Sequence, residues 1–200
     1  ALTEALDLRE RAAGALQPTM VVLIGVVGSF LLISAVGDRF TKSAEAKGQA
    51  YKNIALAFLI SFAIGVHNFG EGLAIGAAYS IGQATLGGIL VLGFMIHNTT
   101  EGIAIVTPVT KTGVGLGRLA AMGMIAGLPT IVGAWVGGFS SSPIWSVLFL
   151  SIGAGAVLQV IYVLLKNLET DPVSALTTGP SLSGLLSGFA LMYATSLMVA

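Results

Sequence analysis

The feature that most constrains the fold of this sequence is the near absence of charge from long apolar stretches. Between Lys52 and Lys111 the only formally charged side chains are Glu71 and Glu101. The apolar runs here and further along the chain are continuous and about 20 residues long, the length of a helix that crosses a bilayer. Transmembrane β-strands would instead alternate apolar and polar residues. The pattern therefore predicts an all-α, polytopic transmembrane helix bundle.

The composition supports a membrane protein and excludes several other classes. Of the 200 residues, 55% are hydrophobic and 9% are charged, whereas soluble domains carry about 25% charged residues. The formal net charge is zero, so the chain lacks the basic footprint of a nucleic-acid-binding protein. It contains no cysteine, which rules out disulfides, iron–sulfur clusters and thiolate metal sites.

The distribution of apolar and basic residues predicts the number of spans and their orientation. Six spans are expected, at about 18–37, 53–80, 83–106, 119–138, 144–165 and 182–199. Lysine and arginine occur in the loops after the first, third and fifth spans, and such loops face the cytoplasm. The polar loop 38–52 is then cytoplasmic, while the charged segment 1–17 and the C-terminus are extracytoplasmic.

Two matching polar motifs interrupt the second and third spans. They read His67-Asn68-x-x-Glu71-Gly72 and His97-Asn98-x-x-Glu101-Gly102, and they contain both histidines of the chain. Residues four apart lie on one helix face, so each histidine is expected beside the glutamate of its own motif. Ionisable side chains inside a span are costly and therefore indicate a functional site.

If the two motif helices pack together, their imidazole nitrogens and their amide and carboxylate oxygens form a mixed cage. That donor set suits zinc and related first-row divalent ions better than magnesium or calcium. A histidine–glutamate proton relay without metal is one alternative, and a haem held by two histidines is another. The chain has neither a His-Glu-x-x-His protease motif nor a nucleotide-binding motif, so no enzyme activity is expected.

The motif pair resembles the ZIP (Zrt/Irt-like) family of divalent metal transporters, especially its prokaryotic members. The stretch 127–134 is similar to the family's sixth helix and 153–156 to its seventh. The resemblance implies that the six spans correspond to helices three to eight of an eight-helix fold, with two helices preceding this sequence. By position, it implies metal ligands at His67, Asn68, Glu71, His97, Asn98 and Glu101.

The resemblance further implies transport of Zn²⁺, or of Fe²⁺, Mn²⁺ or Cd²⁺, towards the cytoplasm across a prokaryotic plasma (inner) membrane. The ion is then the substrate, and no organic cofactor is expected. The partners are the ion and the lipid bilayer. A homodimer is compatible with the glycine pairs of the fourth and sixth spans, which are expected to pack within the bundle. A bis-histidine haem redox protein and a proton-coupled solute carrier remain the alternative functions.

The chain departs from the family pattern at three positions that bear on a second metal. Many relatives have Glu where Asn98 stands and a second His where Gly102 stands, and some bacterial members offer a carboxylate where Thr130 stands. One strong metal site and a weak or absent second one are therefore expected. Ser61, Thr130 and Gln159 are candidates for lining the ion path, with interhelical hydrogen bonding as their alternative role.

Overall fold

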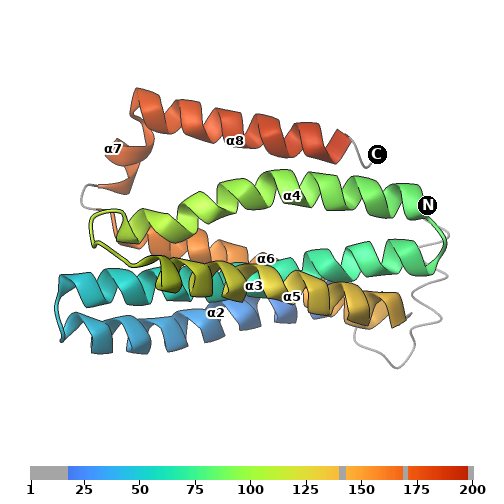
Figure 1. Cartoon of the computed structure of the whole chain (residues 1–200), viewed down its shortest axis with the longest axis horizontal. Helices are drawn as coiled ribbons and strands as arrows, with labels where there is room; N and C mark the ends of the chain where they lie inside the picture. The colour runs from blue at the N-terminus through green and yellow to red at the C-terminus, as the bar shows by residue number, and fades with distance from the viewer. Residues whose placement is uncertain (1–17, 140–142, 169–170, 198–200) are drawn as a thin grey trace.

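The computed structural model describes residues 18–139, 143–168 and 171–197, and within these ranges it contains helices and no strand. The expected extracytoplasmic segment 1–17 lies outside the described residues. The helices are α2 (Pro18–Glu45), α3 (Gln49–Ser80), α4 (Ala84–Val106), the short 3₁₀ helix η1 (Thr107–Val109), α5 (Leu116–Phe139), α6 (Pro143–Lys166), α7 (Pro172–Leu176) and α8 (Gly179–Leu197) (Figure 1). The chain is thus an all-helical bundle, as the sequence predicts.

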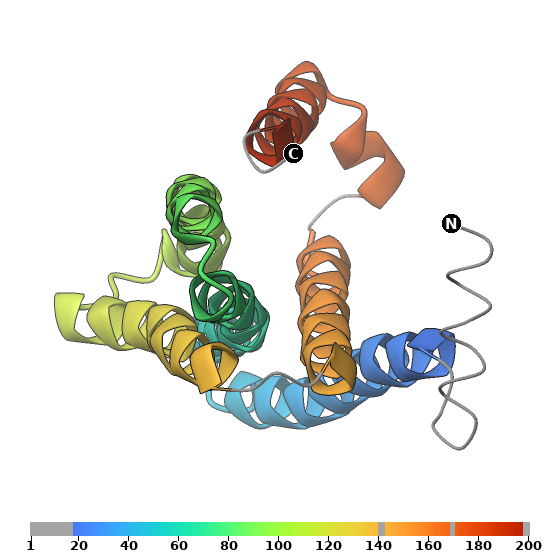
Figure 2. The same cartoon turned by 90° about the vertical axis from the view of Figure 1, so that its right-hand side faces the viewer.

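Five helices, not six, are long and apolar enough to cross a membrane in the described part of the chain. They are Thr19–Glu45, Gln49–Ser80, Ala84–Val109, Leu116–Phe139 and Ile144–Lys166. The expected sixth span at 182–199 is not among them, and its last two residues lie outside the described residues, so this span stays a prediction. The helix found there, α8, has 19 residues, and its serines and glycines dilute its apolar character. In the described residues it contacts α4 and its neighbour α7 and otherwise lies apart (Figure 2).

The expected polar loop 38–52 is mostly helical. The stretch from Asp38 to Glu45 contains no glycine or proline, so α2 continues through it despite its charges. The chain turns only at Gly48, whose φ of 117° favours glycine, and α3 begins one residue later. A short helix, α7, also forms where only a polar loop was expected, because the side chain of Asp171 accepts a hydrogen bond from Ser174 N at 3.0 Å.

The central helix is α3, which is surrounded by α2, α4, α5 and α6 (Figure 2). Its contact with α5 is closest, because glycines on both helices face the partner's backbone. Gly72 and Gly76 lie against α5, and Gly133 and Gly137 lie against α3. Without side chains at these positions the two backbones can approach directly, which is how helices pack in a membrane.

A second close pair is formed by α2 and α6, which run in the same direction. Gly25 packs against Ser151, and Gly155 packs against Ser29. Toward the later end of both helices, Lys166 Nζ donates a hydrogen bond to Asp38 Oδ1 at 2.9 Å. These contacts fix the register between the two helices along their length.

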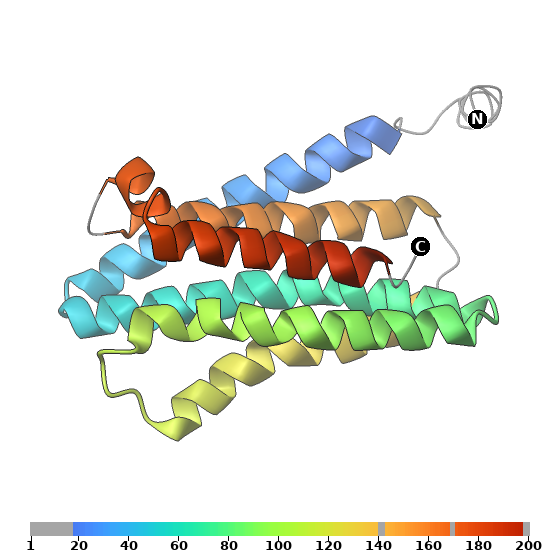
Figure 3. The same ribbon diagram turned by 90° about the horizontal axis from the view of Figure 1, so that it is seen from above.

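All lysines and arginines in the described residues lie at one end of the bundle, called here the basic end. They belong to the region around the α2–α3 turn, the α4–α5 connection and the end of α6, which lie together (Figures 1 and 3). They are Arg39, Lys42, Lys47, Lys52, Lys111, Arg118 and Lys166.

The apolar core of the bundle is displaced toward this basic end. We call it the basal cluster. It consists of Ile33, Leu56, Ala57, Leu59, Ile60, Ala63, Ile64, Ile105, Val109, Met122, Ala126, Ala156, Val160 and Val163. Every helix from α2 to α6, together with η1, contributes side chains from its half nearer the basic end. The two polar motifs lie beyond this cluster, toward the opposite end.

Candidate metal centre

The two polar motifs face each other because α3 and α4 form an antiparallel hairpin. The hairpin turns at Gly82, which has a φ of 78°. His67 and His97 are equidistant in sequence from Gly82, so the hairpin brings them to the same level. The sequence therefore encodes the convergence of the motifs through the short turn and the matched distances on either side of it.

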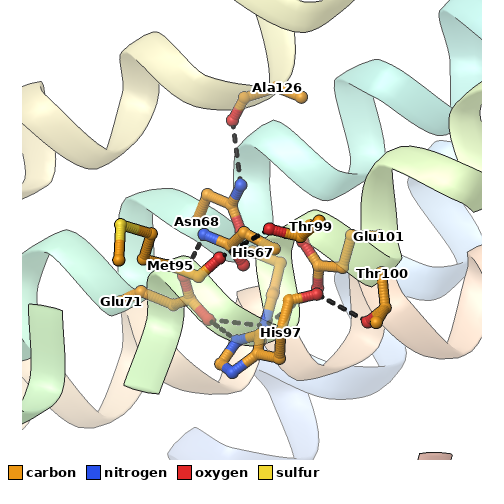
Figure 4. Close-up of polar contacts among 10 residues, drawn as sticks. His67, Asn68, Glu71, Met95, His97, Thr99, Thr100, Glu101 and Ala126 are labelled. Carbon is orange, nitrogen blue, oxygen red and sulfur yellow. Dashed lines mark hydrogen bonds and ion pairs between the residues drawn. The ribbon is translucent and has the colours of Figure 1, made fainter. Parts of the chain in front are cut away.

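Three side chains form a compact group around one carboxylate oxygen (Figure 4). His67 Nε2 lies 3.5 Å from Glu71 Oε1, and His97 Nε2 contacts the same oxygen from the other helix. One donor atom from each of His67, Glu71 and His97 lies within 4.8 Å of the others. Glu71 and His97 are buried, while 29% of the His67 side chain is exposed.

Glu101 lies at the edge of this group. Its Oε1 is 3.8 Å from His67 Nε2, and its Oε2 is buried without a hydrogen-bond partner. His97 thus faces Glu71 across the helix interface, and Glu101 faces His67. The expected pairing within one motif holds for His67 and Glu71. In the α4 motif, His97 and Glu101 instead contact residues of α3.

The two asparagines are each held by their amide nitrogen. Asn98 Nδ2 donates to Glu71 Oε2 at 3.0 Å, and Asn68 Nδ2 donates to the Ala126 carbonyl of α5 at 3.0 Å. The Oδ1 atoms of both residues are buried and have no hydrogen-bond partner. Together with Glu101 Oε2, they give the motif region three buried oxygens available to accept a proton donor or a cation.

Neighbouring residues fix the histidines. A Cβ added to Gly153 of α6 would lie 3.2 Å from His67 Cα and 3.5 Å from its Nδ1, so glycine here lets α6 approach the histidine. Thr100 donates to the His97 carbonyl at 2.6 Å, and the Phe94 ring meets the His97 ring edge-on with centroids 5.4 Å apart. The two motifs do not indicate Gly153 as a site residue, but the Gly-Ala-Gly-Ala run 153–156 that contains it is typical of close helix packing.

The three candidate path residues lie outside the compact group. Ser61 is fully buried and donates to the Ala57 carbonyl of its own helix at 2.8 Å. Thr130 is partly buried in the α3–α5 contact, where its carbonyl faces Gly72. Gln159 is 1% exposed on α6, and its Oε1 has no hydrogen-bond partner.

The centre has the donor chemistry of a divalent transition-metal site. It offers two imidazole nitrogens and two carboxylates, with two amide oxygens nearby. Two carboxylates would balance the charge of a dication, which reduces the cost of burying either charge alone. Mixed nitrogen and oxygen donors suit Zn²⁺ and its first-row neighbours.

Comparison with protein-family models, with curated proteins and with solved structures finds no significant match to this chain. Evidence on function therefore comes from the two motifs and their geometry.

Proposed function

We propose that this chain is a membrane transporter for divalent metal ions, Zn²⁺ in the first place, of the ZIP type. The observation that carries the proposal is the convergence of two histidines from adjacent apolar helices on one buried carboxylate, with a second carboxylate beside them. Buried ionisable groups in apolar helices mark ion pathways. Their donor types select a first-row dication as the ion. Fe²⁺, Mn²⁺ and Cd²⁺ are the related substrates to compare.

Three unpartnered oxygens favour a metal over a metal-free proton relay. A relay needs only a continuous chain of donors and acceptors, which His67, Glu71 and His97 already form. The buried oxygens of Asn68, Asn98 and Glu101 would then lack partners, and each such atom costs about 1–3 kcal/mol. A cation bound beside His67, with water in its remaining positions, would offer partners to the oxygens that lie near the centre.

The arrangement of the histidines disfavours a bis-histidine haem. Both Nε2 atoms contact Glu71 Oε1, so a carboxylate oxygen lies where the iron of a broad macrocycle would have to be. In a haem protein the proximal groups instead leave a flat apolar slot for the macrocycle. A haem would therefore require α3 and α4 to separate.

The charge distribution supports uptake toward the cytoplasm. Basic ends of membrane proteins face the cytoplasm, and the basal cluster lies between the metal centre and that end. His67 and Glu101 keep 29% and 20% of their side chains exposed, so the centre is not sealed within the bundle. In this orientation α8 runs from the cytoplasmic side to the outer side (Figure 1), in keeping with an extracytoplasmic C-terminus. A prokaryotic plasma membrane follows from the family resemblance.

In the proposed mechanism the ion replaces hydrogen bonds within the centre. A metal at the centre takes the Glu71 oxygen that His97 now contacts, and the imidazole nitrogens bind it in their neutral form. The Glu71 oxygen that Asn98 holds stays occupied, which favours one strongly held ion. Movement of helix groups past each other then exposes the centre to the other side, as in alternating access. Protonation of the ligands opposes binding, so acidic solution slows uptake.

The test is radioactive zinc uptake into proteoliposomes that contain the purified complete gene product. Wild type is compared with Glu71→Ala and Glu101→Ala, and Glu45→Ala serves as the matched control. Glu45 is an exposed acid at the basic end, where it pairs with Lys52. We expect uptake by wild type and Glu45→Ala and at least a tenfold loss in the other two variants. Zinc flux equal in all four samples, or absent from wild type, would refute the proposal.

Two further measurements address the other functions. A Soret band in the purified protein that disappears in His97→Ala would establish a haem protein instead. Uptake of an organic solute driven by a proton gradient, lost in Glu71→Ala while no zinc binds, would establish a solute carrier.

A further inference from the structure

Two polar side chains are fully buried at the level of the basal cluster. Among the described residues, the buried polar and charged side chains are Ser29, Ser61, Asn68, Glu71, His97, Ser151 and Gln159. Of these, only Ser61 and Gln159 lie on the basic-end side of the metal centre, between the centre and the basic end. They therefore lie at a depth of the bundle that a transported ion has to cross.

Gln159 lies on α6, nearer the basic end than the metal centre, and one turn after Gly155, which packs against α2. It follows Gly153, which packs against His67, by six positions toward the basic end. At a rise of about 1.5 Å per residue, the two levels are about 9 Å apart. Its helix neighbours Ala156, Val160 and Val163 belong to the basal cluster.

The two buried polar residues differ in how their atoms are satisfied. The hydroxyl of Ser61 bonds the Ala57 carbonyl of its own helix at 2.8 Å. The carbonyl oxygen of the Gln159 side chain has no hydrogen-bond partner. An unpartnered buried oxygen destabilises the fold and calls for an explanation such as a bound water or ion.

A second unpartnered oxygen lies at the same level on α2. The Gly25–Ser151 and Gly155–Ser29 contacts set the register of α2 and α6, and this register places Ser34 level with Gln159. The hydroxyl oxygen of Ser34 is buried and also lacks a hydrogen-bond partner. Two oxygens that are otherwise unused thus occur at one depth of the bundle.

We propose that Gln159 is an inner ligand for the transported cation, reached after the ion leaves the His/Glu centre, with Ser34 as a second oxygen at that level. This inference rests on the proposed transport function. A dication that crosses an apolar barrier needs oxygen to replace its lost water. A neutral amide oxygen binds more weakly than the two carboxylates of the centre. The ion is therefore held long enough to cross and still released toward the basic end.

The test compares zinc uptake with zinc binding in Gln159→Leu and in the unbranched variant Gln159→Met. Both substitutions remove the amide oxygen and introduce an apolar side chain of similar size. We expect at least a tenfold fall in the initial uptake rate. The zinc dissociation constant of the centre, measured by calorimetry, should stay within about twofold of wild type, and the thermal midpoint should be unchanged or higher.

The matched control is Ser151→Ala, which removes another buried polar side chain of α6. Its hydroxyl donates to the Val147 carbonyl of the same helix at 2.6 Å, so uptake should stay within about twofold of wild type. Gln159→Glu keeps a carboxyl oxygen at the position and should take up zinc faster than Gln159→Leu. If Gln159→Leu does not fold, the comparison is made between Gln159→Met and Gln159→Glu.

The failure of this inference is distinguishable from failure of the proposed function. Absence of zinc uptake by wild type counts against the function. Wild-type uptake with equal rates in Gln159→Leu and Gln159→Met shows that Gln159 is no ligand. A parallel loss of zinc binding at the centre, or equal rates in Gln159→Glu and Gln159→Met, would also overturn the inner-ligand role.

Discussion

Asn98 Nδ2 donates a hydrogen bond to Glu71 Oε2 at 3.0 Å and so joins the two polar motifs across α3 and α4. The other oxygen of this carboxylate, Oε1, contacts His97 Nε2. Both oxygens of Glu71 therefore have partners from α4. Asn98 acts through its nitrogen to hold the central carboxylate and keeps its own oxygen free.

Replacing this amide with a carboxylate should change the stoichiometry of metal binding. In Asn98→Asp the donated hydrogen bond is lost and two carboxylates face each other, so the metal-free protein should lose about 1–3 kcal/mol of stability. The added negative charge should allow a second zinc ion to bind near Glu101. Calorimetric titration should give about one zinc per chain for wild type and a value approaching two for the variant.

Asn98→Ala is the control for this prediction. It also removes the hydrogen bond to Glu71 but adds no charge, so it should lose stability without gaining a second ion. A stoichiometry that is the same in wild type, Asn98→Asp and Asn98→Ala would contradict the argument.

His97 should matter more than His67 for the metal-free fold. It is the more buried of the two, with 8% of its side chain exposed against 29%, and it contacts the buried Glu71 directly. His97→Ala leaves that carboxylate without one of its partners and should cost about 2–3 kcal/mol. His67→Ala should cost less than about 1 kcal/mol, since Glu71 keeps both contacts from α4.

Metal-free unfolding of the two histidine variants in mixed micelles provides the measurement. Both variants should bind zinc at least tenfold more weakly than wild type, because each loses an imidazole ligand. Equal destabilisation by the two substitutions would argue against the unequal roles of the histidines in holding Glu71.

Zinc itself should stabilise the wild-type chain. A ligand that binds only the folded state at 100 times its dissociation constant adds about 2.7 kcal/mol. The thermal midpoint should therefore rise with zinc and fall again on adding a chelator. In Glu71→Ala the rise should disappear, because the central carboxylate of the group is lost. A similar rise in that variant would place the binding site elsewhere.

The sequence predicted the helical bundle and the motif helices because both depend on local patterns. Uninterrupted apolar length gives spanning helices, and the spacing of each motif places its polar residues on one face. The sequence did not predict that α2 continues to Glu45, because a run of polar residues is compatible with either a helix or a loop. The expected span 182–199 is a different case: in the described part of α8, serines and glycines separate the apolar residues, and the span also includes residues beyond Leu197.

The composition of the centre was predictable, whereas its pairings were not. The repeated motif identified His67, Glu71, His97 and Glu101 without any structure. The contact of His97 with Glu71 rather than Glu101 depends on the relative rotation of α3 and α4, which the α3–α4 contact and α3's packing against α5 and α6 determine. The anchoring of Asn68 to the Ala126 carbonyl depends on contact between residues far apart in sequence. No local pattern carries that information.

The glycine contact between α3 and α5 leads to a last prediction, since it also holds Asn68 in place. A methyl group at Gly72 would overlap the Thr130 carbonyl oxygen and lie 2.8 Å from Ala134 N. Gly72→Ala should push the helices apart, lower stability by about 1–3 kcal/mol and weaken zinc binding by displacing Glu71.

Gly127→Ala is the matched control, because a Cβ there meets nothing within 4 Å, and it should be neutral or stabilising by up to about 1 kcal/mol. Unfolding in mixed micelles and zinc titration measure both effects. Similar results for the two substitutions would contradict close α3–α5 packing.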